Sequence, residues 1–220
     1  MRTILVTGFE PFEGETINPS GEIARQLHGK VVAGHRVAGV LLPCVFGAAV
    51  RELRRQIRLA KPALVVCLGQ AGGRAEITPE RVAINVDDAR IADNAGWQPV
   101  DRPVVRGGPA AYWSTLPIKA IVTALRRRGY PAAVSQTAGT FVCNHVFYGL
   151  MHELRGKFGV RGGFIHVPFL PEQARRRAPG RGRRVPPSLA QAAMTEAIAL
   201  ALQVAVENRR DIRRAGGSIQ

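Results

Sequence analysis

The stretch S-Q-T-A-G-T-F-V-C-N, residues 135–144, joins an apolar segment at 132–134 to a helical pattern over 144–158. This order predicts a strand, a turn and a helix. Cys143 would then lie at the helix N-terminus, where the positive end of the helix dipole favours the thiolate. Cys143 is therefore a candidate nucleophile. The alternative is a small buried core residue, which is what most free cysteines are.

Strands and helices alternate along the rest of the chain. Compact apolar runs predict strands at 4–7, 36–42, 63–68, 82–86, 132–135 and 163–167, and apolar residues at helical spacing predict helices at 23–27, 46–59, 116–128, 144–158 and 189–207. Ser20 and Ser188 are the expected caps of the first and last helix. The alternation predicts an α/β fold with three α/β/α layers, in which helices cover both faces of a mostly parallel twisted sheet.

We expect the whole chain, 1–220, to form this single domain. Residues 175–187 are rich in Arg, Gly and Pro and predict a surface loop, and the polar residues 211–220 predict a flexible tail. The segment 91–117 is rich in turn residues. A loop of that length in a compact domain is often functional, as a lid or an interface.

Composition limits the environments in which the protein is expected. Of the 220 residues, 46% are hydrophobic and 21% are charged, as in ordinary globular domains. No apolar run approaches the ~20 residues that span a bilayer, and the first residues show no signal-peptide pattern. The three cysteines, Cys44, Cys67 and Cys143, are too widely spaced for a disulfide framework. We therefore expect a cytoplasmic protein without membrane partners.

The net charge of +15 raises a second hypothesis, a basic nucleic-acid-binding protein on the same scaffold. Arginines gather at 175–184 and at 209–214. Neither cluster is interleaved with aromatic residues that could stack on bases. A solvated basic surface is the favoured interpretation, and nucleic-acid binding is the less favoured one.

His166 is the histidine best placed to act on Cys143. It stands near the end of the expected strand 163–167, at the edge of a parallel sheet where the turn before Cys143 also arrives. His145 is too close to Cys143 in sequence to face it on a helix, and His152 lies too far along the same helix. His166 is therefore the candidate general base, with a hydrogen-bonded core histidine as the alternative.

A cysteine–histidine pair also needs a group that fixes the orientation and tautomer of the imidazole. Spacing alone leaves four acidic candidates open: Glu80, Asp87, Asp88 and Asp93. A metal site is less expected, because the sequence contains no H-E-x-x-H motif and no paired C-x-x-C motifs.

Two loops that follow expected strands carry further signals. Phe9 and Phe12 lie just past the strand at 4–7, where aromatic side chains either line a ligand crevice or pack the loop onto the core. The G-Q-A-G-G sequence at 69–73 does not have the spacing of a dinucleotide-binding motif. Its glycines indicate a close approach of the backbone to another group.

Six collinear motifs carry a resemblance to a known family. They are T-G-F-E-P-F, G-Q-A-G-G-R-A-E-I-T-P-E-R-V-A-I-N, D-D-A-R-I-A-D-N, G-P-A-A-Y-W-S-T-L-P-I-K, T-A-G-T-F-V-C-N-H and G-F-I-H-V-P. Together they are spread over most of the range 3–173 and resemble pyroglutamyl-peptidase I, also called pyrrolidone-carboxylate peptidase. The resemblance implies a cysteine peptidase that removes an N-terminal pyroglutamyl residue from peptides. It implies no metal and no organic cofactor, and it implies a homo-oligomer, often a tetramer.

The resemblance also assigns roles to residues. It implies that Cys143 is the nucleophile, that His166 is the base and that Glu80 orients it. Arg90 matches an arginine near the oxyanion. The backbone N–H of Cys143 is the other group expected to stabilise the oxyanion. The positions that match the family's pyroglutamate pocket are Phe9, Phe12, Gln70, Ile91, Phe141 and Val142.

Three features depart from the family pattern. Glu13 stands where a glycine is usual, Gln136 replaces the common Asn before T-A-G-T, and the segment 175–187 is longer and more basic than usual. None of them touches the three expected catalytic residues. Glu13 nevertheless raises a third hypothesis, a related amidase with an altered substrate preference.

Overall fold

The four longest strands lie side by side and run parallel through the centre of the molecule. They belong to a six-stranded sheet with the order β2-β3-β1-β4-β8-β5 in a computed structural model that describes residues 1–157, 159–178 and 184–217. The parallel strands are β1 (Arg2–Phe9), β3 (His35–Leu42), β4 (Leu64–Gln70) and β8 (Arg161–Val167). The short edge strands β2 (Val31–Val32) and β5 (Thr78–Pro79) run antiparallel to their neighbours.

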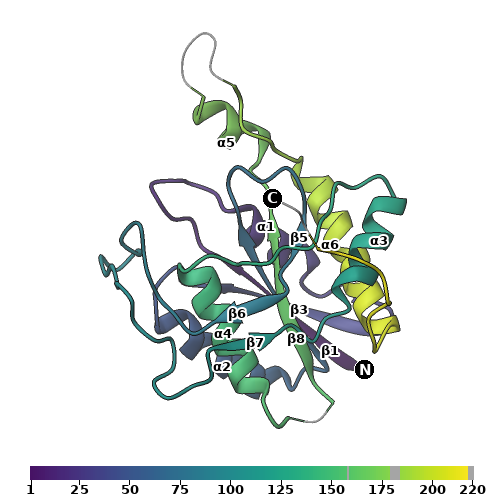
Figure 1. Ribbon diagram of the computed structural model, residues 1–220. Coiled ribbons are helices and arrows are strands. Elements are labelled where there is room, and N and C mark those ends of the chain that lie inside the picture. Colours follow the sequence, from purple (N-terminus) through teal and green to yellow (C-terminus); the bar gives the residue numbers. More distant parts are fainter. Residues whose placement is uncertain (158, 179–183, 218–220) are drawn as a thin grey trace.

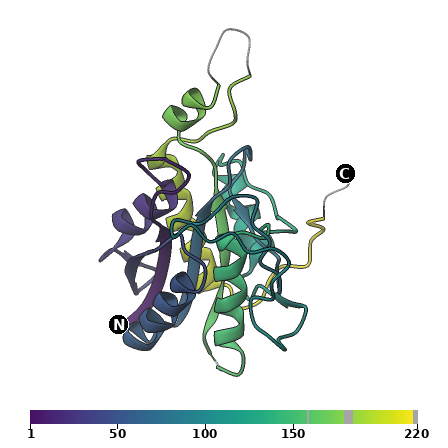
Figure 2. The same cartoon turned by 90° about the vertical axis from the view of Figure 1, so that its left-hand side faces the viewer.

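Helices cover both faces of this sheet, and the predicted three-layer α/β/α fold is confirmed (Figure 1). One face packs against α1 (Pro19–Leu27), α3 (Ile118–Arg127) and α6 (Gln191–Glu207). The other packs against α2 (Ala48–Ala60) and α4 (Val142–Leu154). A second, two-stranded sheet of β6 (Val82–Ile84) and β7 (Ala111–Trp113) contacts α4. The short helix α5 (Pro171–Arg176) projects beyond one end of the sheet, as Figure 2 shows from a second side.

The central strands are apolar on both faces because both faces are buried. Ile4 and Val6 of β1 point into the core beneath α1, α3 and α6, whereas Leu5 points into the core beneath α2 and α4. A parallel sheet covered on both sides therefore produces continuous apolar runs rather than alternation. This is why β1, β3, β4 and β8 were predicted from the sequence.

The segment at 132–135 does not form the predicted strand. It makes only two isolated bridges, between Ile77 and Ala132 and between Glu80 and Ser135. The Ser135 hydroxyl donates to the carbonyl of Thr137 and accepts from its N–H, at 3.0 and 3.3 Å. This local turn ends the pairing after a few residues. The predicted strand at 82–86 is also shorter, because the Asn144 side chain takes up the backbone groups of Ile84 and the carbonyl of Val86.

Both predicted serine caps were wrong. Asn18 caps α1, because its Oδ1 accepts a hydrogen bond from the Ser20 N–H at 3.1 Å. Ser20 lies inside the helix and accepts from the Phe9 N–H instead. Ser188 pairs with Phe169 in an isolated bridge, and α6 begins only after Ala190.

Helix α4 begins and ends earlier than the predicted 144–158, since it runs from Val142 to Leu154; Phe158 lies outside the described residues. The predicted loop at 175–187 begins with the last turn of α5, and its residues 179–183 also lie outside the described residues. None of the described helices is long and apolar enough to cross a membrane.

Candidate active site

Cys143 lies in the first turn of α4, at the end of the sheet where β4 and β8 finish. Its sulfur packs against Gly69 of β4 so closely that a Cβ atom at Gly69 would lie 2.8 Å from Sγ. Gly69 is the register partner of His166 in the β4–β8 pair. The missing side chain at Gly69 therefore leaves the space in which the thiol sits beside the strand that carries His166.

His166 is buried and makes a hydrogen bond with Glu80, with 2.7 Å between Nδ1 and Oε1. Burial works against the ionised form of Glu80, but the hydrogen bonds of His166 and Ser135 and the charge of Arg74 outweigh it and hold the Glu80 pKa below its ordinary value. An ionised carboxylate only accepts hydrogen bonds, so Nδ1 carries the proton. Nε2 is then left free to take a proton from another group.

Tertiary structure separates Glu80 from the other acidic candidates. Glu80 directly follows β5, which pairs antiparallel with β8, and its N–H donates to the Phe164 carbonyl at 2.9 Å. Asp87 contacts His145 instead, at 2.8 Å. Asp93 accepts from backbone N–H groups, including that of Phe46. Only Glu80 among them bonds to His166.

Arg74 is a member of the site to which the sequence analysis assigned no role. Its Nη1 lies 2.6 Å from Glu80 Oε1 and also donates to the Thr78 and Ser135 hydroxyls. Its Nη2 donates to the Thr137 carbonyl. Arg74 thus ties the buried carboxylate to the turn that precedes Cys143. Its position in the G-Q-A-G-G-R motif was the available signal.

The environment of Cys143 favours the neutral thiol. Burial raises its pKa well above the ordinary value; the nearby Cys44 and Glu80 add to the shift, and Arg74 opposes it. The expected effect of the helix dipole is outweighed, so the thiol needs a base. Burial also raises the pKa of Cys44 and of Cys67 to about 12, as befits unreactive core thiols.

A cavity of about 470 Å³ opens next to this cluster and collects most of the predicted pocket residues. Phe12 and Phe141 both line it and pack against one another, with their ring centroids 6.2 Å apart. Its full lining is Phe12, Glu13, Gln70, Gly72, Gly73, Asp88, Arg90, Ile91, Thr140, Phe141, Phe169, Arg177 and Pro186. The cavity therefore combines aromatic and aliphatic walls with a few polar groups, as small-molecule sites do.

Two predicted pocket residues do not line this cavity. Phe9 is buried and packs against Phe164, with 6.4 Å between the ring centroids. Val142 is fully buried in the core beneath α2 and α4. Both lie behind the cavity wall, where they support the neighbouring residues.

Gln70 and Arg90 are placed differently at the cavity. Gln70 is buried, and its Oε1 accepts a hydrogen bond from Gln173 of α5 at 3.0 Å. This bond orients the Gln70 amide so that its NH2 group is available, and Gln173 was not predicted. The Arg90 side chain is 84% exposed and lies 3.7 Å from Glu13 at the cavity rim. Its role near the oxyanion stays a prediction.

The other histidines of α4 have structural contacts. His145 makes the hydrogen bond to Asp87, and its Nε2 accepts from the Gly47 N–H at 2.9 Å, which joins α4 to the start of α2. His152 contacts the Tyr112 hydroxyl at 2.8 Å. In the part of the chain that is described, no group of three or more His, Cys, Asp and Glu side chains could hold a metal ion.

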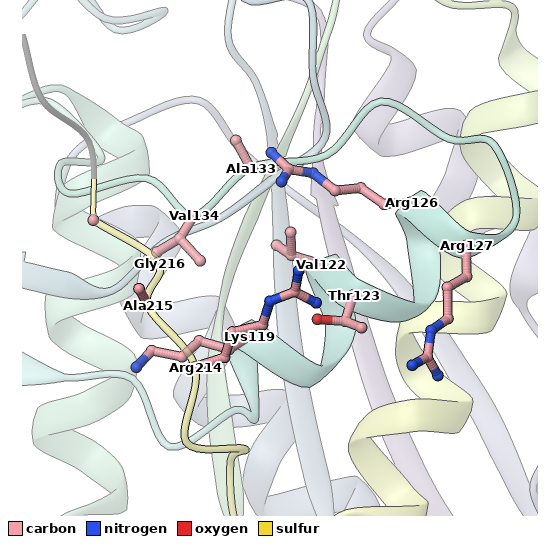
Figure 3. Close-up of a pocket in the computed structure, with 11 residues that line it drawn as sticks. Lys119, Val122, Thr123, Arg126, Arg127, Ala133, Val134, Arg214, Ala215 and Gly216 are labelled. Carbon is pink, nitrogen blue, oxygen red and sulfur yellow. The ribbon is translucent and has the colours of Figure 1, made fainter.

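A second hollow, of about 530 Å³, lies between α3 and the segment 214–217 and contains none of the predicted site residues. Figure 3 shows its lining, including the basic side chains of Lys119, Arg126 and Arg214. The 214–217 segment is held there because Arg81 donates to the Gly216 carbonyl at 3.0 Å. The hollow offers positive charge but neither a nucleophile nor a base, so it is not the candidate active site.

Comparisons with known proteins identify the family of the chain. The family model described as pyroglutamyl peptidase matches residues 2–208. The pyrrolidone-carboxylate peptidase of Klebsiella pneumoniae is 58% identical over 218 residues, which are 99% of each chain. That of Bacillus mycoides is 53% identical over 219 residues, again 99% of each.

Solved structures of this family superimpose on the chain over nearly its whole length. The pyroglutamyl peptidase I of Bacillus amyloliquefaciens superimposes with a TM-score of 0.92 at 47% identity, over 97% of this chain and 99% of that one. The pyrrolidone carboxyl peptidase of Thermococcus litoralis gives 0.93 at 39% identity, over 98% and 100%. By sequence and by structure, this chain belongs to the pyroglutamyl peptidase family.

Proposed function

We propose that Cys143, His166 and Glu80 perform the activity that follows from membership of this family of cysteine peptidases. That activity is hydrolysis of the bond after an N-terminal pyroglutamyl residue. The observation that carries the assignment of roles is the buried 2.7 Å hydrogen bond between His166 and Glu80, on the strand next to the Cys143 thiol. Cys143 is the nucleophile, His166 the general base, and Glu80 the group that orients it.

The first half of the reaction forms a thioester. Glu80 holds the Nδ1 proton, so the His166 Nε2 accepts the thiol proton while Sγ attacks the carbonyl carbon of the pyroglutamyl residue. The carbonyl oxygen becomes an oxyanion. The N–H of Cys143, which lies in the first turn of α4 and has no helical acceptor, stabilises it. His166 then donates its proton to the leaving amine as the C–N bond breaks.

The second half regenerates the enzyme. A water molecule gives a proton to the His166 Nε2 and attacks the thioester carbon. The C–S bond breaks, the sulfur regains a proton from His166, and free pyroglutamate leaves. These steps need no metal ion and no organic cofactor.

The cavity supplies the selectivity for a lactam. Pyroglutamate is small and uncharged, which suits the walls formed by Phe12, Ile91 and Phe141, with the Gln70 amide as a hydrogen-bonding group. The Glu13 carboxylate is already occupied by Arg177 at 3.0 Å. The other carboxylate of the lining, Asp88, is exposed. An ordinary N-terminal ammonium placed between the apolar walls would lose its hydration and is disfavoured.

The decisive test is release of aminocoumarin from a pyroglutamyl-aminocoumarin substrate. Cys143→Ala should abolish release, while Cys67→Ala, which changes a core thiol, should retain it. Full activity of Cys143→Ala would contradict the assignment. A prolyl substrate tests the alternative of an amidase with altered preference, and salt-sensitive binding to nucleic acid tests the less favoured hypothesis.

We also propose that the chain acts as a single domain, 1–220, in a cytoplasmic homotetramer. Its cysteines are free, which suits a reducing compartment. Trp97, Val100 and Trp113 of the 91–117 segment are at least half exposed, and large apolar side chains exposed in this way suit a subunit interface. Light scattering on the purified protein measures the assembly, and a monomer would contradict it.

A further inference from the structure

Glu13 occupies a backbone position that a glutamate does not favour. The Glu15 N–H donates to the Phe12 carbonyl at 3.1 Å, which closes a turn around Glu13 and Gly14. Both central residues have positive φ, 54° for Glu13 and 73° for Gly14. This is the pattern of a type I′ turn, which selects Gly, Asn or Asp. A glutamate in this conformation costs free energy, and contacts of its side chain can offset that cost.

The compensation comes from arginines on other segments. Glu13 Oε2 lies 3.0 Å from Arg177 Nη2, and Glu13 Oε1 lies 3.7 Å from Arg90. Glu15, at the end of the same turn, lies 3.2 Å from Arg177 and 2.9 Å from Arg176. The side chains of Glu13 and Arg177 are each only about one-third exposed, at 33% and 32%. Their attraction is therefore screened less than that of a fully exposed pair.

The Glu13–Arg177 pair crosses over the middle of the sheet. Glu13 is on the loop that follows β1, and Arg177 ends the helix α5 that follows β8. In the sheet, β4 lies between β1 and β8. The pair thus spans the carboxyl end of β4, above Gln70 in the cavity lining.

The same pair connects two walls of the cavity. Phe12 is the residue before Glu13 and faces Phe141. The Arg177 guanidinium carbon lies 4.9 Å from the ring centroid of Phe169, a cation–π contact, and Phe169 also lines the cavity. The attraction between Glu13 and Arg177 therefore keeps the side of the cavity lined by Phe12 close to the side lined by Phe169.

We propose that Glu13 and Arg177 are positioning residues for substrate binding, forming a clamp that sets the width of the lactam cavity. This inference rests on the proposed function. In the described part of the chain, neither side chain makes a hydrogen bond or ion pair with Cys143, His166 or Glu80, so the clamp acts on binding rather than on the chemical step. It would raise substrate affinity by keeping Phe12 in place before the ring arrives.

The kinetic test compares KM with kcat for the pyroglutamyl-aminocoumarin substrate. Glu13→Gln and Arg177→Gln should each raise KM about two- to fivefold, the scale of one partly exposed ion pair, with kcat changed less than about twofold. Arg55→Gln is the matched control, because Arg55 pairs with Glu52 within α2 and does not line the cavity. Salt of about 1 M should raise the wild-type KM toward that of the variants and leave the variants' KM nearly unchanged.

Thermal unfolding tests the clamp without using activity. The two glutamine variants and their double variant should show coupled rather than additive changes in Tm. Glu13→Gly should have the higher Tm of the two Glu13 variants, because glycine relieves the positive φ, yet it should share the raised KM.

Wild-type KM in both glutamine variants, or an equal rise in Arg55→Gln, would overturn the clamp. Inactivity of the unaltered chain would instead overturn the proposed function. In that case the unfolding cycle still decides the ion pair: additive Tm changes refute the clamp, and coupled ones support it.

Discussion

His166 and Glu80 are 86 positions apart in the sequence and share a buried hydrogen bond of 2.7 Å between Nδ1 and Oε1. The bond exists because β5, just before Glu80, pairs antiparallel with the end of β8. Because this bond occupies Nδ1, the His166 Nε2 is left free to exchange a proton with another group. Four measurements test the site that is built around it.

Glu80→Gln should reduce kcat strongly while the protein stays folded. Glutamine keeps the size of the side chain but can donate as well as accept, so it no longer selects the His166 tautomer with the proton on Nδ1. The loss in a comparable triad is on the order of 10⁴-fold, and we expect at least ~10²-fold here. Glu76→Gln, a nearby glutamate outside the hydrogen-bonded cluster, serves as the control. A loss of less than tenfold would argue against an orienting role for Glu80.

Arg74→Gln should make the protein less stable in acid. Burial raises the pKa of Glu80, but the His166 and Ser135 hydrogen bonds and Arg74 bring it below the ordinary value. A carboxylate with a lowered pKa stabilises the fold above its unfolded-state pKa, and that contribution disappears as the pH falls through the folded-state pKa. Without Arg74 the folded-state pKa moves up, so acid unfolding should begin at a higher pH. Circular dichroism across an acid titration measures this, and an unchanged midpoint would contradict it.

Alkylation of Cys143 should keep accelerating as the pH rises. Burial places the thiol pKa well above the ordinary 9.0. The rate of iodoacetamide modification, followed by mass spectrometry, should therefore still increase above that pH. Cys143→Ala should show almost no labelling in the folded state, because Cys44 and Cys67 are buried. A rate that is already constant at neutral pH would show instead that the resting thiol is ionised.

Gly69→Ala should damage the site at the point where two strands and α4 meet. The added Cβ would lie 2.8 Å from Cys143 Sγ and 2.7 Å from the Phe164 ring, so the nucleophile or the ring must move. A displacement of about 1 Å commonly lowers activity by about 10²-fold. Gly217→Ala is the control, because nothing lies within 4 Å of a Cβ there. An unchanged kcat in Gly69→Ala would show that Cys143 Sγ can shift away from the added Cβ without loss of activity.

The sequence predicted the long elements better than the short ones. β1, β4, β8 and the helices α2 and α6 have clear apolar runs or helical spacing, which reflect burial directly. β5, β7 and α5 have two, three and six residues, too few to show a period. The Ser20 cap failed for a similar reason. Asn18 and Ser20 are both good cap residues, and only the tertiary hydrogen bond from the Phe9 N–H to the Ser20 hydroxyl separates them.

The sequence by itself determined the candidate pair, Cys143 and His166, and the framework that holds it. A cysteine expected at a strand-to-helix turn and a histidine at a strand end were predicted to meet at the edge where parallel strands finish. Cys143 reaches that edge, although the segment 132–135 before it forms only two isolated bridges. The family motifs then singled out Glu80. Only the tertiary structure decided that Arg74 joins the carboxylate, that Phe9 and Val142 lie behind the cavity, and that Glu13 meets Arg177. These contacts join residues far apart in the chain, and no local pattern encodes which distant side chains a fold brings within reach.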